Sequence, residues 1–250
     1  MNYEEKVRSE LVKWESEMMQ EAWVLQRWSR KLQQRVDKLI PEKVHQTLSK
    51  AMEIAVKSVL SGIDMLPFSE TKLAEYRSLT LVEQDVYCGD LLSKYKKIAA
   101  AEGVGTGVGG ILLAAVDYPA LLAIKLKFLS ETAQIYGFDI REYSERVFLL
   151  KVFQLAYSGD ASRKRVFEQV KYWNGKTGFP TEDASLEEAV SWREFYTEYR
   201  ESIEFKKILS FIPIVGAAFS GWANYSLLDE LGSCAKNAYR MRLLNKRATR

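Results

Sequence analysis

The chain has 250 residues, of which 47% are hydrophobic and 28% charged, and its formal net charge is +3. These values are typical of a globular protein with a substantial core, and they exclude an intrinsically disordered chain and a polytopic channel. The small net charge gives no support for nucleic-acid binding. Cys88 and Cys234 belong to no disulfide or metal motif, and the polar start MNYEEKVRSE does not resemble a signal peptide. We therefore expect a cytoplasmic protein.

Residues 1–40 carry hydrophobic side chains at steps of three or four, beginning with Val7, Leu11, Trp14 and Met18. This spacing predicts one long amphipathic helix that ends before Pro41. We interpret the hydrophobic stripe as facing the protein's own core, with a coiled coil or a membrane-surface helix as alternatives. A second helix is predicted over 42–60, and the breaker SGIDMLPF follows it.

A capping box begins the central part of the chain. Thr80 and Glu83 have the spacing at which a hydroxyl and a carboxylate satisfy the exposed amides of a helix start. The predicted helix leads through Ile98 into a run of five glycines. Asp117 is then predicted as the N-cap of a new helix, with Pro119 in its first turn.

This new helix should end near Tyr136, because Gly137 can adopt the left-handed conformation that stops a helix. Asp139 and Glu142 have the spacing of a second capping box, and we expect the helix after it to end near Tyr157.

The most loop-like part of the chain is NGKTGFPTEDAS, within 158–184. Ser185 and Glu188 predict the start of another helix, and the last hydrophobic block covers 208–228. Strand patterns are almost absent. The sequence therefore predicts an all-α protein of one domain over 1–250, with helical parts at 1–60, 80–157 and 186–245.

The glycine run, GVGTGVGG at 103–110, is not a phosphate-binding loop by its pattern. Its last glycine is followed by Ile111 and Leu112, where a Walker loop has lysine and a hydroxyl residue. The alanine-rich segment before it does not resemble the buried strand of a dinucleotide site. The four-residue spacing of Gly103 and Gly107 instead predicts a nearly bare helix face that another helix can approach closely.

The block 208–228 repeats this spacing in Gly216 with Ser220 and in Ala217 with Gly221, so we predict a multi-helix bundle in which two glycine-rich apolar helices pack together. The uncharged stretch 208–228 has the length of a membrane span, but its proline and polar residues favour burial. The candidate packing or ligand-contact residues are Gly103, Gly105, Gly107, Gly109, Gly110, Asp117, Pro119, Gly216, Gly221 and Asn224.

The end of the chain is basic, since no acidic residue follows Glu230. This tail is a candidate contact for anionic lipid, while a solvated helix end is the alternative. The candidate residues are Lys236, Arg240, Arg242, Lys246 and Arg247.

Three groups of segments resemble the EcsC protein family: AAAEGVGTGVGGILLAAVDYPALL followed by IYGFD; IPIVGAAFSGWANY with the later AYRMRLL; and LIPEKVHQ. In some bacteria, members of this family accompany the Ecs ABC transporter, whose ATPase and membrane subunits are separate chains. That system is linked to secretion, competence and regulated proteolysis at the membrane. The resemblance implies no catalytic residues.

The expected function is that of a non-enzymatic accessory protein, peripheral to the inner face of the cell membrane, with membrane lipid and an ABC transporter subunit as partners. We expect no metal and no cofactor, because His45 is the single histidine and no ligand cluster accompanies it. The alternative is a soluble hydrolase or small-molecule binder that uses Glu102 and Asp117 as an acid pair beside the glycine-rich helix.

Overall fold

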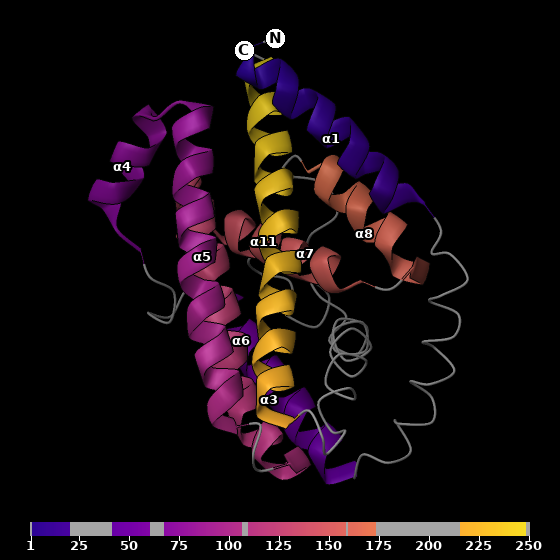
Figure 1. Ribbon diagram of the computed structural model, residues 1–250. Coiled ribbons are helices and arrows are strands. Elements are labelled where there is room, and N and C mark those ends of the chain that lie inside the picture. Colours follow the sequence, from indigo (N-terminus) through magenta and orange to yellow (C-terminus); the bar gives the residue numbers. More distant parts are fainter. Residues whose placement is uncertain are drawn as a thin grey trace.

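The computed structural model describes residues 2–20, 42–60, 68–106, 110–158, 160–173 and 216–248. These residues form eight helices and no strand, which confirms the predicted all-α class (Figure 1). In chain order the helices are α1 (Tyr3–Met19), α3 (Glu42–Leu60), α4 (Glu70–Ser78), α5 (Leu81–Thr106), α6 (Gly110–Ile135), α7 (Tyr143–Tyr157), α8 (Asp160–Lys171) and α11 (Gly216–Ala248).

The first helix is shorter than predicted. α1 ends at Met19, because Gln20 has an extended backbone, so the expected single helix over 1–40 is wrong; residues 21–41 lie outside the described part of the chain. The hydrophobic stripe of α1 does face the core, since Val7 and Trp14 are buried and Trp14 packs edge-on against Phe167 of α8. The predicted helix at 42–60 is confirmed as α3.

α5 and α6 form an antiparallel hairpin. The predicted capping box starts α5: the Thr80 amide donates to Glu83, and the Glu83 amide donates to the Thr80 hydroxyl. Tyr95 of α5 packs against Phe128 of α6 with 5.7 Å between ring centroids. Near the start of α5, Asp85 meets Tyr136, just beyond the end of α6. Positions further along α5 therefore face positions earlier in α6.

The hairpin corrects two expectations about the glycine run. Gly103 lies on α5 and Gly110 on α6, and the two helices are antiparallel, so the glycine run does not form one continuous helix face; Gly107 lies outside the described residues. Asp117 lies inside α6, not at its N-cap, and Pro119 is also inside the helix. A helix interior accepts proline at a cost when neighbouring groups satisfy the freed carbonyl.

Gly137 ends this hairpin as the sequence predicts. It has φ +83°, and the amides after α6 turn back to close the helix, from Gly137 to Gln134 and from Phe138 to Ala133. The second predicted capping box is wrong. Glu142 is itself the N-cap of α7, and the Asp139 carboxylate binds the backbone amide and guanidinium of Arg141.

α11 runs antiparallel along α5 for most of their lengths (Figure 1). Asp85 pairs with Arg240 near one end, and Lys96 pairs with Asp229 further along. Between these pairs, Gly232 lies so close to Leu92 that an added Cβ would be 2.4 Å from Leu92 Cδ1. The glycine that permits close helix contact in the described structure is therefore Gly232, which is not among the glycines predicted to pack.

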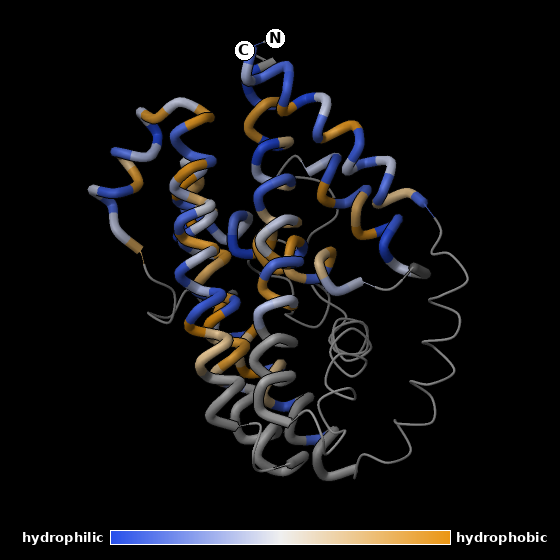
Figure 2. The backbone as a smooth tube through the Cα atoms, in the orientation of Figure 1, coloured by the Kyte–Doolittle hydropathy of each residue, from blue (hydrophilic) through white to orange (hydrophobic). Residues whose placement is uncertain are grey.

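α7 crosses the centre of the molecule and is buried along almost its whole length. α8 follows it, so part of 158–184 is helical, which the sequence analysis did not predict. Figure 2 shows hydrophobic positions gathered where α6 and α7 pass through the centre, while α1, α4 and α8 at the periphery carry many hydrophilic ones. Buried residues of seven helices, all except α4, join in one hydrophobic cluster.

The two ends of the molecule differ. The N- and C-termini meet at one end, which we call the termini end (Figure 1). The last turn of α5, the first turns of α6 and the first turns of α11 meet at the opposite end, which we call the glycine end. The candidate residues of the sequence analysis are thus divided between two distant places.

Candidate functional site

A buried ionic cluster joins four segments at the termini end. Asp85 of α5 and Arg240 of α11 have side chains that are 3% and 5% exposed, and they pair through two oxygens and two nitrogens. The Arg240 Nε to Asp85 Oδ1 distance is 2.8 Å and the Nη2 to Oδ2 distance is 2.6 Å. Tyr136 and Tyr3 donate their hydroxyls to the same carboxylate, and Glu10 of α1 accepts from Arg240 Nη1 at 2.9 Å.

The electrostatics of this cluster favour a permanently charged pair. Burial raises the pKa of Asp85, but hydrogen bonds from Arg240, Tyr136 and Tyr3 outweigh it and hold that pKa below its ordinary value. Burial and the nearby negative groups raise the pKa of Tyr136. A carboxylate that accepts from three donors and stays ionised is poorly suited to proton transfer near neutral pH. We interpret the cluster as structural.

A second ion pair holds the same helix to α7. Arg242 makes two hydrogen bonds to the Glu145 carboxylate, which is 7% exposed. The guanidinium also lies over two rings, 4.3 Å from the centroid of Phe138 and 4.5 Å from that of Phe148. Paired charges beside aromatic faces are stable when partly desolvated.

The basic tail is therefore largely neutralised from within. Arg240 pairs with Asp85 and Glu10, Arg242 with Glu145, and Arg247 with Glu4 of α1. Arg240 and Arg242 are engaged inside the protein, which argues against the lipid contact predicted for these two residues. Of the other candidates in the tail, Lys236 is half-buried, and Lys246 is exposed.

A third group of polar residues lies halfway between the two ends. Lys96 of α5 donates to Asp229 of α11 at 2.5 Å, and its Nζ lies 4.0 Å from the centroid of the Tyr225 ring. On the other side of α5, the Tyr95 hydroxyl donates to Glu131 of α6 at 2.5 Å. Burial and then the bond to Glu131 raise the pKa of Tyr95, so its hydroxyl remains a donor. These contacts show that Tyr95 and Lys96 of α5, Glu131 of α6 and Asp229 of α11 lie at about the same height in the bundle.

Comparison with known proteins identifies the family of this chain. Residues 5–244 match the model of the EcsC protein family. The chain belongs to the EcsC family. It is 37% identical over 239 residues to the protein named "Protein EcsC" of Bacillus subtilis (strain 168), covering 96% of this chain and 95% of that one. It is 26% identical over 253 residues to "Uncharacterized protein YdbA" of the same organism, covering 95% and 92%. No solved structure matches it.

The candidate glycines of this EcsC-family protein lie at the glycine end, as far as they are described. Gly103 and Gly105 are in the last turn of α5, Gly110 begins α6, and Gly107 and Gly109 lie outside the described residues. Gly216, Gly221 and Asn224 lie in the first turns of α11.

Because α5 and α11 are antiparallel, the end of α5 lies beside the start of α11. Asp85 faces Arg240 and Lys96 faces Asp229, so each step along α5 is matched by one step back along α11. Extended at this spacing, the register puts the level of Gly103 near that of Trp222. Close packing of the two apolar blocks through these glycines stays a prediction, because the described side chains of α11 begin at Tyr225.

The alternative acid pair also stays a prediction. Continued along the hairpin, the register of Tyr95 with Phe128 puts Glu102 of α5 opposite Leu121 of α6, about one helical turn from Asp117. The side chains of Glu102 and Asp117 lie outside the described part. Among the described residues, no group of three or more potential metal ligands occurs.

Proposed function

We propose that this EcsC-family protein is a membrane-associated, non-enzymatic accessory protein that contacts lipid with its glycine end. One observation supports this most directly. Residues 103–116 and 208–228 contain no charged residue, and the helices that carry parts of both stretches reach the same end of the molecule. Uncharged helix ends on an otherwise highly charged helical protein are suited to the boundary between lipid headgroups and acyl chains.

The internal pairing of the tail supports the glycine end over the termini end as the contact surface. The guanidinium groups of Arg240, Arg242 and Arg247 already have carboxylate partners. Transferring them to phosphate would leave carboxylates without partners, and for Asp85 and Glu145 these are buried. Contact of lipid with the uncharged helix ends at the glycine end would break none of these ion pairs.

Shallow insertion suits the lengths of these segments better than a span. Within the described residues, no helix combines the length and the hydrophobicity that crossing a membrane requires. The uncharged part of α6, from Gly110 to Val116, makes about two helical turns. A segment of that length reaches the headgroup boundary and not the far side of a bilayer.

Fractionation of cells tests the proposal. We expect the protein in the membrane fraction, partly resistant to a high-salt wash and released by carbonate, because apolar contact and charge both hold it. The variant Phe219→Glu places a charge in the uncharged part of α11 and should move the protein to the soluble fraction. Ser233→Glu on the exposed face of the same helix is the matched control and should leave the distribution unchanged. Recovery of all the wild-type protein in the soluble fraction before any wash would contradict membrane association.

The partner that we propose besides lipid is a subunit of an ABC transporter, as the family resemblance implies. Membranes solubilised in mild detergent allow a tagged copy to be isolated and tested for the ATPase and membrane subunits of the transporter. We expect both to be enriched with the wild type and with Ser233→Glu. Equal recovery of these subunits from cells without the tag would contradict the partnership.

A further inference from the structure

We propose that three lysines at mid-height of the bundle, Lys94, Lys97 and Lys127, bind the phosphates of anionic lipid headgroups and set the depth to which the glycine end enters the bilayer. This inference rests on the proposed function, and we call the three residues the lysine band. It assigns the charged contact to helices α5 and α6, away from the basic tail.

The lysine band lies at one level of the molecule. Lys94 and Lys97 flank Tyr95 and Lys96 on α5, and Lys127 precedes Phe128 on α6. Tyr95 contacts Phe128 and Glu131, and Lys96 contacts Asp229 of α11, so the three helices pass this level side by side. The glycine end begins within about two turns of it on α5.

The ammonium groups of the lysine band are available to bind an anionic ligand. Lys94, Lys97 and Lys127 are exposed, and none of them is paired with a carboxylate within the described ranges. Two of the nearby acids have other partners: Glu131 accepts from Tyr95, and Asp229 accepts from Lys96. The paired Lys96 is only 13% exposed, which contrasts with the band. Exposed ammonium groups without a carboxylate partner are the ones that gain most from a phosphate.

Side chains suited to the interface accompany the lysines. Tyr225 of α11 is 43% exposed and Ile98 of α5 is 38% exposed, and both lie at this level on the side of the glycine end. Tyrosine rings concentrate where headgroups meet acyl chains, and lysine stems extend along apolar surface while the ammonium remains among phosphates. Along α5 the order is therefore the uncharged stretch, the single acid Glu102, Ile98 and then the lysines. Apolar chemistry thus lies on the glycine side of the band, as it lies on the inner side of the phosphates in one leaflet.

Vesicle flotation with the purified full-length protein tests the band. The vesicles contain phosphatidylcholine alone or phosphatidylcholine with phosphatidylglycerol. We expect tighter binding to the anionic vesicles, with a preference that weakens as potassium chloride is added. Replacing all three lysines by glutamine should reduce affinity for anionic vesicles about a hundredfold, because each lysine near an anionic surface contributes roughly a factor of five. Affinity for neutral vesicles should stay the same.

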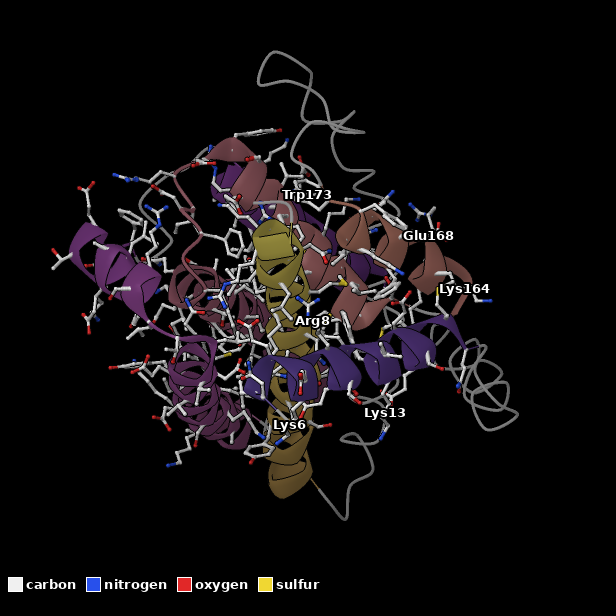
Figure 3. The ribbon with its side chains drawn as sticks, turned by 90° about the horizontal axis from the view of Figure 1, so that it is seen from above. Lys6, Arg8, Lys13, Lys164, Glu168 and Trp173 are labelled. Carbon is white, nitrogen blue, oxygen red and sulfur yellow. The ribbon has the colours of Figure 1, made fainter. Side chains whose placement is uncertain are left out.

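A second triple variant with the same loss of charge is the control. Lys6, Arg8 and Lys13 project from α1, which begins at the termini end (Figure 1), and all three are exposed; Figure 3 labels them. Replacing these three by glutamine should leave both affinities within about twofold of wild type, because charges further than a Debye length from the membrane are screened. An equal loss in both triple variants would overturn the band as a site, since net charge alone would then explain binding.

The remaining outcomes separate the two proposals. Equal binding of wild type and band variant to both vesicle types would overturn the lysine band and leave membrane contact standing. No binding to either vesicle would overturn both proposals. A label on Ile98→Cys should be quenched by brominated lipid, whereas a label on Val12→Cys, on α1, should not. Quenching at Val12 alone would overturn the orientation. The native Cys88 and Cys234 are buried, and burial raises the pKa of both thiols, to about 11 and about 12, so they react slowly.

Discussion

Tyr136 and Tyr239 are both buried and lie with their rings stacked, 5.9 Å between centroids, yet their hydroxyls are in opposite situations. Tyr136 donates to the ionised Asp85 at 2.6 Å. Within the part of the chain that the structure describes, the Tyr239 hydroxyl has no hydrogen-bond partner, although it is fully buried among the rings of Phe138 and Phe148. A buried polar group without a partner lowers stability, and a bond to a buried charge raises it.

The two tyrosines therefore predict opposite effects of the same substitution. Tyr239→Phe should leave the free energy of unfolding unchanged or raise it by up to about 1 kcal/mol, because it removes an unsatisfied hydroxyl. Tyr136→Phe should lower it by about 1.5–3 kcal/mol, because Asp85 loses a donor. Urea unfolding measures both. A larger loss in Tyr239→Phe than in Tyr136→Phe would mean that the Tyr239 hydroxyl is hydrogen-bonded in the folded protein.

At the scale of helices, the contact between α5 and α11 depends on one missing side chain. Gly232 is buried against Leu92, where a Cβ would lie 2.4 and 2.5 Å from the two methyl carbons. Gly89 on α5 is an exposed helical glycine, and a Cβ added there would have no atom of another described element within 4 Å. The two residues separate the cost of crowding from the ordinary effect of glycine in a helix.

We expect Gly89→Ala to raise the free energy of unfolding by about 0.5–1 kcal/mol, because alanine has the better helix propensity. Gly232→Ala gains the same propensity but must displace Leu92, and overpacking of this kind costs about 1–3 kcal/mol. It should therefore be less stable than Gly89→Ala by about 1 kcal/mol or more. Urea unfolding of Gly232→Ala with and without Leu92→Ala gives the coupling between the two positions. Equal stability of the two glycine variants would show that α11 can move away from α5 without cost.

At the scale of the whole molecule, the Asp85 cluster joins the first and last helices to the central hairpin. Asp85 is on α5, Arg240 on α11, and Tyr3 and Glu10 on α1. Loss of the Asp85 charge would leave a buried guanidinium with Glu10 as its remaining carboxylate partner. One titration is therefore expected to affect the stability of the complete bundle.

The direction of this effect follows from the lowered pKa of Asp85. Its contribution to stability is fully present above the ordinary aspartate pKa, and it is lost as the pH falls through the lower pKa of the folded state. Wild-type stability should therefore fall between about pH 5 and about pH 3, and Asp85→Asn should show a smaller fall over the same range. Urea unfolding across this range measures both. Asp139 and Glu83 also have lowered pKa values, so the stability of Asp85→Asn should still fall somewhat as the pH is lowered. Parallel pH profiles would show that Asp85 is not ionised in the folded protein.

The sequence by itself determined the features that depend on neighbours along the chain. The all-α class, the capping box at Thr80 and Glu83, the stop at Gly137 and the inward stripe of α1 were all predicted, because propensity, capping and periodicity act within a few residues. The same local rules failed at Asp117. A capping residue followed by proline resembles a helix start, but packing against α5 carries α6 through it.

Only the tertiary structure decided which basic residues pair with carboxylates and where α5 and α11 come into close contact. The basic tail looked available for lipid, but Asp85 pairs with Arg240 across 155 positions and Glu4 pairs with Arg247 across 243. Gly232 stood in no repeated pattern, and its role depends on the register that brings Leu92 opposite. Coulomb attraction and steric fit act over distance in space, so a linear pattern cannot tell a cation that faces a carboxylate from one that faces solvent.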